Sequence, residues 1–215
     1  MPLILFISAS ILTYKVKPYI IIAFLPSAFL WWIWLKIDSS FNSKIIKPLA
    51  IILTFIISIF ILRINEKQLN NIATKAKITA DWVYYKSNKD GGSSYNIGEL
   101  DGTFLGMLKV LPSSVNVTLY RPYIFEVKNI VMLLSSLEST ALLFLTLYLI
   151  ALHKPSNFFN LYFKNPFLLF CLVFSIVFAF AIGSSTYNFG SLVRYKIPLL
   201  PFFTFSLLKI LKSKN

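Results

Sequence analysis

Residues 130–152 read IVMLLSSLESTALLFLTLYLIAL, and this stretch decides the fold because Glu138 is its one charged residue. An α-helix crosses the hydrocarbon core of a bilayer with about 20 predominantly apolar residues. The stretch therefore predicts a transmembrane helix. Similar apolar runs recur along the chain, with the charged residues placed between them, over 3–14, 19–35, 49–64, 167–184 and 197–211.

The composition of the whole chain supports the same fold class. Of its 215 residues, 57% are hydrophobic and 13% are charged, and the mean hydropathy is +0.72, whereas soluble domains are about 25% charged. We predict an all-α, polytopic transmembrane helix bundle of five or six spans. The number stays open because 3–14 is nearer a half-helix than a full span. Pro26 is expected to kink the second span.

The distribution of lysine and arginine predicts the orientation and the division of the chain. Cytoplasmic loops carry an excess of these residues, which places the C-terminus in the cytoplasm and the long loop on the outer face. The predicted parts are the N-terminal spans (1–64), an extracytoplasmic loop (65–129) and three C-terminal spans with a short basic tail (130–215).

The long loop is predicted to be ordered and partly helical. Apolar residues recur at helical spacing over 66–85, which indicates an amphipathic helix on the membrane surface or over the bundle. A dense turn signal at 88–94 should end it. A second short helix is expected over 103–111, stopping at Pro112.

The net charge of +13 would suggest nucleic acid in a soluble protein. Here basic residues beside apolar spans and anionic lipid headgroups explain the charge, so membrane lipid is the expected partner and nucleic acid is not. His153 is the single histidine and Cys171 the single cysteine. We therefore expect no metal site, no internal disulfide and no cofactor.

Glu138 is the most informative single residue. An acid inside a span is costly and usually faces a partner or a wet cavity. At about 1.5 Å of rise per residue it would lie about 12 Å below the outer end of its helix. It is either a functional carboxylate or an interhelical lock bonded by neighbouring hydroxyl groups, and the sequence leaves both open.

The predicted topology gathers further charged side chains at the same outer mouth, namely Arg121, Glu126, Arg194 and Lys196. Arginine offers a planar fork suited to phosphate or pyrophosphate. Four tyrosines, Tyr120, Tyr123, Tyr187 and Tyr195, are placed to stack on sugars or to sit at headgroup level. The alternative is that these residues are headgroup anchors and an Arg–Glu ion pair that closes the bundle.

Two blocks, TLYRPYIFEVKNIVMLLSSLES (118–139) and NFGSLVRYKIPLLPF (188–202), resemble the C-terminal portion of uncharacterised bacterial multi-span membrane proteins associated with polysaccharide and cell-envelope biosynthesis. The resemblance implies a multi-pass protein of the bacterial inner membrane with a membrane glycosyltransferase or O-antigen polymerase-like architecture. Such glycosyltransferases carry an acid in the first outer loop, where this chain has Lys15-Val-Lys17. The resemblance also implies a polyprenyl-linked sugar and envelope-assembly proteins as partners.

On this resemblance we expect a lipid-linked pyrophosphate sugar at the outer mouth. Glu138 and Glu126 would be the candidate catalytic bases. The candidate substrate-binding residues are Arg121, Arg194, Lys196, Tyr123 and Tyr195. A truncated or non-catalytic scaffold is the alternative, and a transporter ranks below it because no inverted repeat is visible.

Overall fold

The computed structural model describes residues 2–38, 66–89 and 92–213, and apart from an isolated bridge between Ser94 and Asn188 the regular structure in these ranges is helical. The all-α prediction is therefore confirmed for the described residues. The elements are α1 (Pro2–Val16), α2 (Pro18–Asp38), α4 (Glu66–Lys89), α5 (Phe104–Lys109), α6 (Leu111–Tyr120), the 3-10 turn η1 (Ile124–Glu126), α7 (Ile130–His153), α8 (Pro155–Lys164), α9 (Pro166–Thr186), α10 (Phe189–Tyr195) and α11 (Leu200–Lys212).

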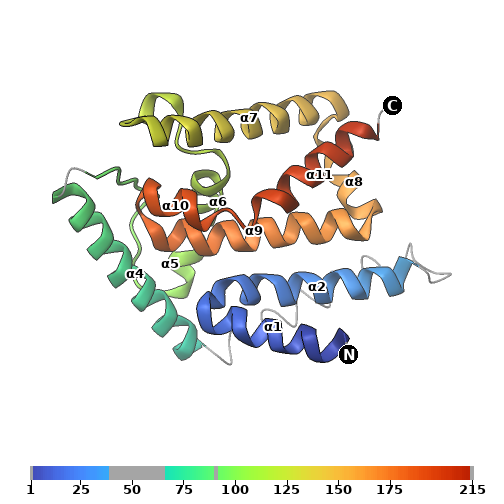
Figure 1. The fold of residues 1–215 in the computed structure, drawn as a ribbon, viewed down its shortest axis with the longest axis horizontal. Helices are drawn as coiled ribbons and strands as arrows, with labels where there is room; N and C mark the ends of the chain where they lie inside the picture. Colours follow the sequence, from blue (N-terminus) through green and yellow to red (C-terminus); the bar gives the residue numbers. More distant parts are fainter. Residues whose placement is uncertain (1, 39–65, 90–91, 214–215) are drawn as a thin grey trace.

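Helix α9 forms the centre of the bundle, with α2 along one side and α11 and α7 along the other (Figure 1). Its aromatic side chains interlock with both neighbours. The ring of Phe174 lies 6.2 Å from Phe24 of α2 and 4.9 Å from Phe202 of α11, both edge to face. Lipid is as apolar as these rings, so close packing, rather than removal from water, holds such helices together in a membrane.

Three described helices are long and apolar enough to cross a membrane, over Tyr19–Lys36, Ile130–His153 and Pro166–Thr186. A shorter apolar helix covers Ile4–Val16. The span predicted over 49–64 lies outside the described residues. The span predicted over 197–211 corresponds to α11, which begins at Leu200 and has 13 residues. The total of five or six spans therefore stays a prediction.

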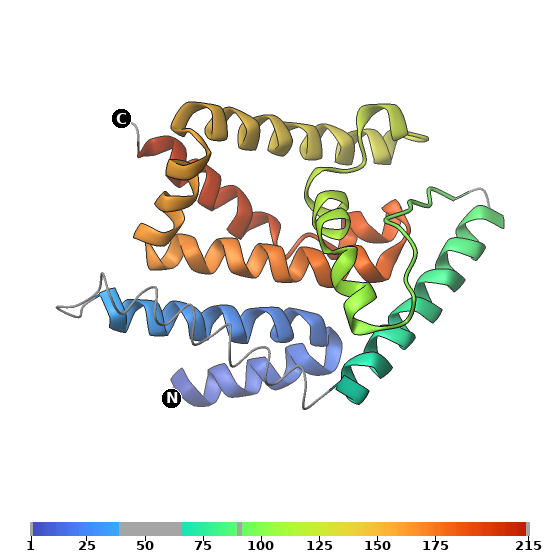
Figure 2. The same ribbon diagram turned by 180° about the vertical axis from the view of Figure 1, so that it is seen from behind.

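The two ends of the bundle differ (Figures 1 and 2). One end carries α4, α5, α10 and the turn between α1 and α2, whereas the other carries α8 and the C-terminus. Helix α2 continues through Pro26. The predicted amphipathic helix is present as α4, and Ala73 and Ala80 are on its buried face.

Helix α6 was not foreseen, because Pro112 was expected to end the helical region. Proline is tolerated in the first turn of a helix, where its missing N–H has no partner to lose, and Pro112 occupies that turn of α6. The helix packs tightly on the C-terminal half of α9. A Cβ built on Gly183 would lie 2.2 Å from the carbonyl oxygen of Ser114, and Thr118 Oγ1 donates to the Ala179 carbonyl at 2.9 Å.

Because Ala179 precedes the end of α9 by seven residues, that contact lies about 10 Å inside the candidate span. The segment predicted as a loop over 65–129 is therefore not uniform. Its first part lies at the end of the bundle, while α6 enters between α7 and α9 (Figure 2).

The last apolar region is a broken helix. Tyr187, at φ 47°, turns the chain back after α9, and Asn188 caps α10 by accepting from the N–H groups of Gly190 and Ser191. Helix α10 ends at Tyr195, and a turn over 196–199 leads into α11. Irregular backbone at membrane depth is tolerated where protein buries it, and Lys196 and Leu199, which bracket the break, are both buried.

Candidate functional site

The break between α10 and α11 places a buried ammonium group beside α7. Lys196 is 1% exposed, and its Nζ lies 2.9 Å from Ser139 Oγ and 3.0 Å from Glu138 Oε1. A charged group enclosed in protein is tolerated only when it is paired and hydrogen-bonded. Glu138 and Ser139 supply both kinds of contact. The structure therefore brings Glu138 and Lys196 into direct contact, whereas the sequence predicted only that they lie at the same mouth of the bundle.

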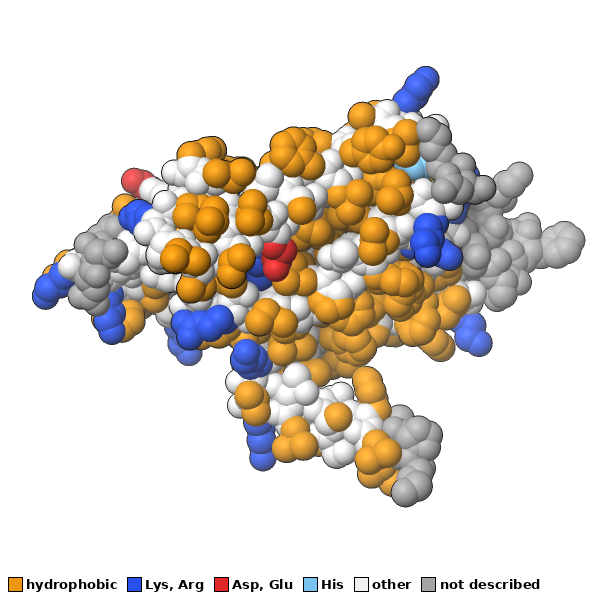
Figure 3. Space-filling model, turned by 45° about the horizontal axis from the view of Figure 1, so that its top comes forward, with side chains coloured by type: hydrophobic (Ala, Val, Ile, Leu, Met, Phe, Trp, Pro, Cys, Tyr) orange, Lys and Arg blue, Asp and Glu red, His pale blue; other side chains and the backbone are white. Residues whose placement is uncertain are grey.

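The carboxylate of this pair is far more open than the ammonium. The side chain of Glu138 is 46% exposed. Its neighbours on α7, Leu134 and Leu137, are 66% and 52% exposed and belong to the apolar outer face of that helix. Figure 3 looks onto this side of the molecule and shows an acidic side chain, with a basic one beside it, in a field of hydrophobic side chains.

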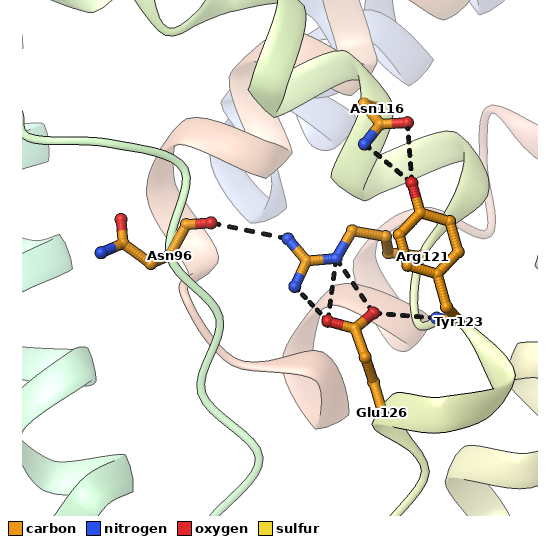
Figure 4. Close-up of polar contacts among 5 residues, drawn as sticks. All are labelled: Asn96, Asn116, Arg121, Tyr123 and Glu126. Carbon is orange, nitrogen blue, oxygen red and sulfur yellow. Dashed lines mark hydrogen bonds and ion pairs between the residues drawn. The ribbon is translucent and has the colours of Figure 1, made fainter.

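A second acid–base pair lies in the turn that leads into α7 (Figure 4). The Arg121 Nε donates to both carboxylate oxygens of Glu126, at 3.1 and 3.0 Å, and Nη2 donates to Oε1 as well. The Glu126 Oε2 also accepts from the backbone N–H of Tyr123 at 2.9 Å. Both side chains are 18% exposed. This is a closed, forked pair of the kind that fixes geometry.

The remaining surface of the Arg121 guanidinium is also occupied. Its Nη1 lies 3.5 Å from the Asn96 carbonyl oxygen. Its central carbon lies 5.9 Å from the ring centres of Tyr95 and Tyr123 and 5.3 Å from that of Phe189. Cations stack favourably on aromatic faces at such distances. These contacts leave Arg121 little capacity for an external phosphate.

Tyr123 is likewise held by its surroundings. Its hydroxyl pairs with the side-chain amide of Asn116, at 3.1 and 3.3 Å, and its ring stacks on Phe125 at 5.3 Å. The closed-pair alternative raised by the sequence therefore describes the geometry around Arg121, Glu126 and Tyr123.

Ser139 joins the two pairs, and sequence reasoning did not single it out. Its hydroxyl donates to the Arg121 carbonyl oxygen at 3.1 Å and accepts from Lys196 Nζ at 2.9 Å. It is fully buried. No local signal marked it, because adjacent residues of a helix do not face each other and Lys196 comes from a distant part of the sequence.

Arg194 and Tyr195 face different neighbours. Arg194 is exposed, and its Nε donates to the Gly190 carbonyl of its own helix at 3.1 Å. It lines a cavity of about 370 Å³ between α10 and the start of α7, together with Ser93, Asn129, Val131, Met132, Phe189, Gly190 and Val193. The Tyr195 ring lies instead toward α2, 6.2 Å from Tyr19 and 5.3 Å from the Lys17 ammonium.

No group of three histidine, cysteine or acidic side chains is arranged to hold a metal ion within the described ranges. Cys171 is buried and unpaired there.

Comparison with known proteins identifies no relative. No family model, no curated protein and no solved structure matches the chain. The candidate site therefore rests on its own geometry. It consists of a closed pair, Arg121 and Glu126, an open pair, Lys196 and Glu138, and Ser139, which is hydrogen-bonded to a member of each.

Proposed function

We propose that this chain is an integral membrane protein of cell-envelope glycan biosynthesis that handles a lipid-linked pyrophosphate sugar in the groove between α7 and α10. The observation that carries the proposal is the Lys196–Glu138 pair, in which protein encloses the ammonium while the carboxylate stays open on the outer face of α7. A ligand anchored in the bilayer reaches such a site by diffusing sideways within the membrane.

The groove offers contacts for both parts of such a ligand. Arg194 uses only its Nε for the bond to Gly190, and its two terminal nitrogens have no partner among the described residues. That leaves its planar edge for a phosphate. Val131, Met132 and Val193 line the adjoining cavity of about 370 Å³ and suit the first units of a polyprenyl chain.

The Lys196–Glu138 pair lies outside the lining of that cavity, further along α7, and in this proposal Glu138 supplies the base that glycosyl transfer needs. The acceptor hydroxyl oxygen attacks the anomeric carbon as the bond from that carbon to the pyrophosphate breaks. Glu138 accepts the proton from the hydroxyl, and the lipid pyrophosphate leaves with the bonding electrons. Arg194 stabilises the negative charge that develops on the leaving group, and the buried Lys196 holds the Glu138 carboxylate in position.

Arg121, Glu126 and Tyr123 have no ligand contact in this proposal, because each already has an internal partner. Tyr195 is also left out, since its ring lies toward α2. The proposal therefore keeps Glu138, Lys196 and Arg194 from the candidates that the sequence suggested.

Binding of a fluorescent undecaprenyl pyrophosphate to the full chain in lipid nanodiscs tests the proposal. Arg194→Ala should weaken binding by about tenfold, the equivalent of one charge-assisted hydrogen bond. Glu138→Gln should not weaken binding, because it removes only the proposed base while Lys196 stays buried. Lys109→Ala is the matched control, since it removes an exposed cation at the end of α5. Equal binding by the Arg194 and Lys109 variants would reject the groove.

A non-catalytic accessory subunit is the second candidate, and the closed Arg121–Glu126 pair favours it. That pair holds the turn before α7 rigid without leaving a group for chemistry. Surface glycan distinguishes the two candidates. If Glu138→Gln leaves glycan length and abundance unchanged at normal protein levels, the enzymatic function is excluded and the accessory one remains.

A further inference from the structure

A second cavity, of about 560 Å³, lies under α4 and shares no residue with the groove between α7 and α10. Its walls come from α4, from the segment 96–101 and from the residue that follows α9. The lining residues are Lys77, Asp81, Tyr84, Asn96, Gly98, Glu99, Leu100, Asp101 and Tyr187.

Hydrogen bonds between distant parts of the chain build this cavity. Lys77 Nζ donates to the Leu100 carbonyl at 2.6 Å, and Thr74 Oγ1 donates to the Gly102 carbonyl at 3.0 Å. Both bonds fasten the segment to α4. Gly102 has a φ of +83°, a conformation that side chains disfavour, so the segment turns there without strain.

Tyr187 points to a ligand in this cavity. The residue is 6% exposed, yet its hydroxyl has no hydrogen-bond partner in the part of the chain that the structure describes. Its ring is fixed by stacking on Tyr95, with centres 5.7 Å apart and planes inclined by 13°. Burial, and then the nearby Asp81 carboxylate, raise the pKa of Tyr187 to about 12, so its hydroxyl stays a proton donor at neutral pH. The Tyr187 hydroxyl is not one of the fully buried polar atoms without a partner among the described residues, so it reaches the open space of the cavity and can donate to a ligand there.

The backbone at Tyr187 supports a functional reason for this side chain. Its left-handed φ of 47° ends α9, a position where glycine or asparagine is usual. A tyrosine in that conformation carries strain, and strained residues of this kind cluster at ligand sites.

The other lining groups define the ligand chemistry. Asp81, Glu99 and Asp101 can accept hydrogen bonds, and all three are exposed to solvent, although Asp81 Oδ2 also lies 3.5 Å from the Lys77 ammonium. Asp101 uses Oδ1 for the two Thr103 donors, at 2.7 Å each, which leaves Oδ2 for a ligand. These carboxylates are not grouped as a metal site within the described residues. The ring of Tyr84, 41% exposed, offers an apolar face.

We infer that this cavity binds a saccharide unit. Its hydroxyl groups would donate to the carboxylates and accept from Tyr187, while the face of its ring packs on Tyr84. Carboxylate acceptors beside an aromatic face match an uncharged, hydroxyl-rich ring better than an anion, because three acids line the cavity against one lysine, whose ammonium is already bonded to Leu100 and Asp81. The cavity stands apart from the groove between α7 and α10, so the inference holds or fails independently of the proposed function.

Saturation-transfer difference NMR on the full chain in detergent micelles provides the test. The probes are methyl β-D-glucopyranoside, methyl β-D-galactopyranoside, methyl α-D-mannopyranoside and N-acetylglucosamine. At least one should receive saturation, and Tyr84→Ala and Tyr187→Phe should each weaken its binding by about fivefold or more, the size of one lost contact or hydrogen bond. Tyr85→Ala is the matched control, because Tyr85 is its 66% exposed neighbour outside the cavity.

The inference is overturned if none of the four sugars receives saturation, or if Tyr85→Ala weakens binding as much as Tyr84→Ala. Displacement of the bound sugar by spermidine at equimolar concentration would also overturn it, since the carboxylates would then be a cation site. Thermal melting of Tyr187→Phe within a few degrees of the parent chain confirms that a lost signal reports binding. Arg194→Ala should leave the sugar signal unchanged, which separates this test from that of the groove.

Discussion

The two acid–base pairs of this molecule lie on either side of Ser139, and they are built differently. Arg121 and Glu126 are equally shielded, at 18% exposure each, and meet through both carboxylate oxygens. Lys196 and Glu138 meet through one contact of 3.0 Å, with exposures of 1% and 46%. In the first pair both carboxylate oxygens are hydrogen-bonded within the protein, whereas in the second pair the carboxylate is nearly half exposed.

Their sequence separation explains much of this difference. Arg121 and Glu126 lie in one turn, and the same carboxylate also caps the N–H of Tyr123. Local chain geometry therefore brings them together. Lys196 and Glu138 come from different helices, and they meet only because the break after α10 points Lys196 toward α7. The open pair depends on the packing of the whole bundle.

The largest expected effect comes from breaking the closed pair. Arg121→Ala leaves Glu126 charged, mostly buried and without its cation, and removing one partner of a buried pair costs about 3–5 kcal/mol. Thermal unfolding in detergent should show a fall in stability of this size. In the double variant Arg121→Ala, Glu126→Ala the loss should be smaller than the sum of the two single losses. Additive losses would mean that the pair contributes no coupling.

The next effect comes from separating α6 from α9. A Cβ at Gly183 would lie 2.2 Å from the Ser114 carbonyl oxygen, a backbone atom with little freedom to move. Gly183→Ala should destabilise the protein by about 1–3 kcal/mol, the usual cost of overpacking. Gly190→Ala is the control, because its Cβ would meet only the Asn188 side chain, at 3.1 Å. Equal melting temperatures for the two variants would contradict the tight α6–α9 contact.

Single substitutions in the open pair sharpen the comparison further. Glu138→Gln leaves the buried Lys196 ammonium without an acidic partner and should cost about 1–3 kcal/mol. Lys196→Met should cost less, because an apolar chain of similar volume replaces the buried charge and the remaining carboxylate is half exposed. Chemical denaturation of both variants measures the two losses in the free energy of unfolding. A larger loss for Lys196→Met than for Glu138→Gln would show that the carboxylate, not the ammonium, needs its partner for stability.

The smallest effect concerns a carboxylate outside the bundle. Hydrogen bonds from the Thr103 hydroxyl and then the Thr103 backbone N–H hold the pKa of Asp101 below its ordinary value. A depressed carboxyl pKa contributes stability above the ordinary value, and that contribution is lost as the pH falls through the folded value. Asp101→Asn should therefore lose a small part of the acid dependence of stability between neutral pH and about pH 3. An unchanged acid profile would show that the bonds contribute nothing. Because the Asp101 carboxylate is exposed to water, the change in stability on its substitution should be well below the change on substituting a residue of either acid–base pair.

The sequence by itself determined the local features of this protein. The apolar runs around α2, α7 and α9 and the helical spacing of α4 were predictable, because hydropathy and period depend only on neighbouring residues. It also offered an Arg–Glu ion pair as an alternative to a ligand site, without indicating which residues form it. It did not predict α6, because Pro112 was taken for the end of a helix when it lies in the first turn of another.

The tertiary structure alone decided which charged residues meet. Hydropathy predicted a span over 197–211, and the helix there begins at Leu200; what the sequence did not show is that the turn before this helix places Lys196 against Ser139 and Glu138. Such a turn is stable only where other helices bury its backbone and its charge. That support comes from residues far away in the sequence, so no local pattern contains it.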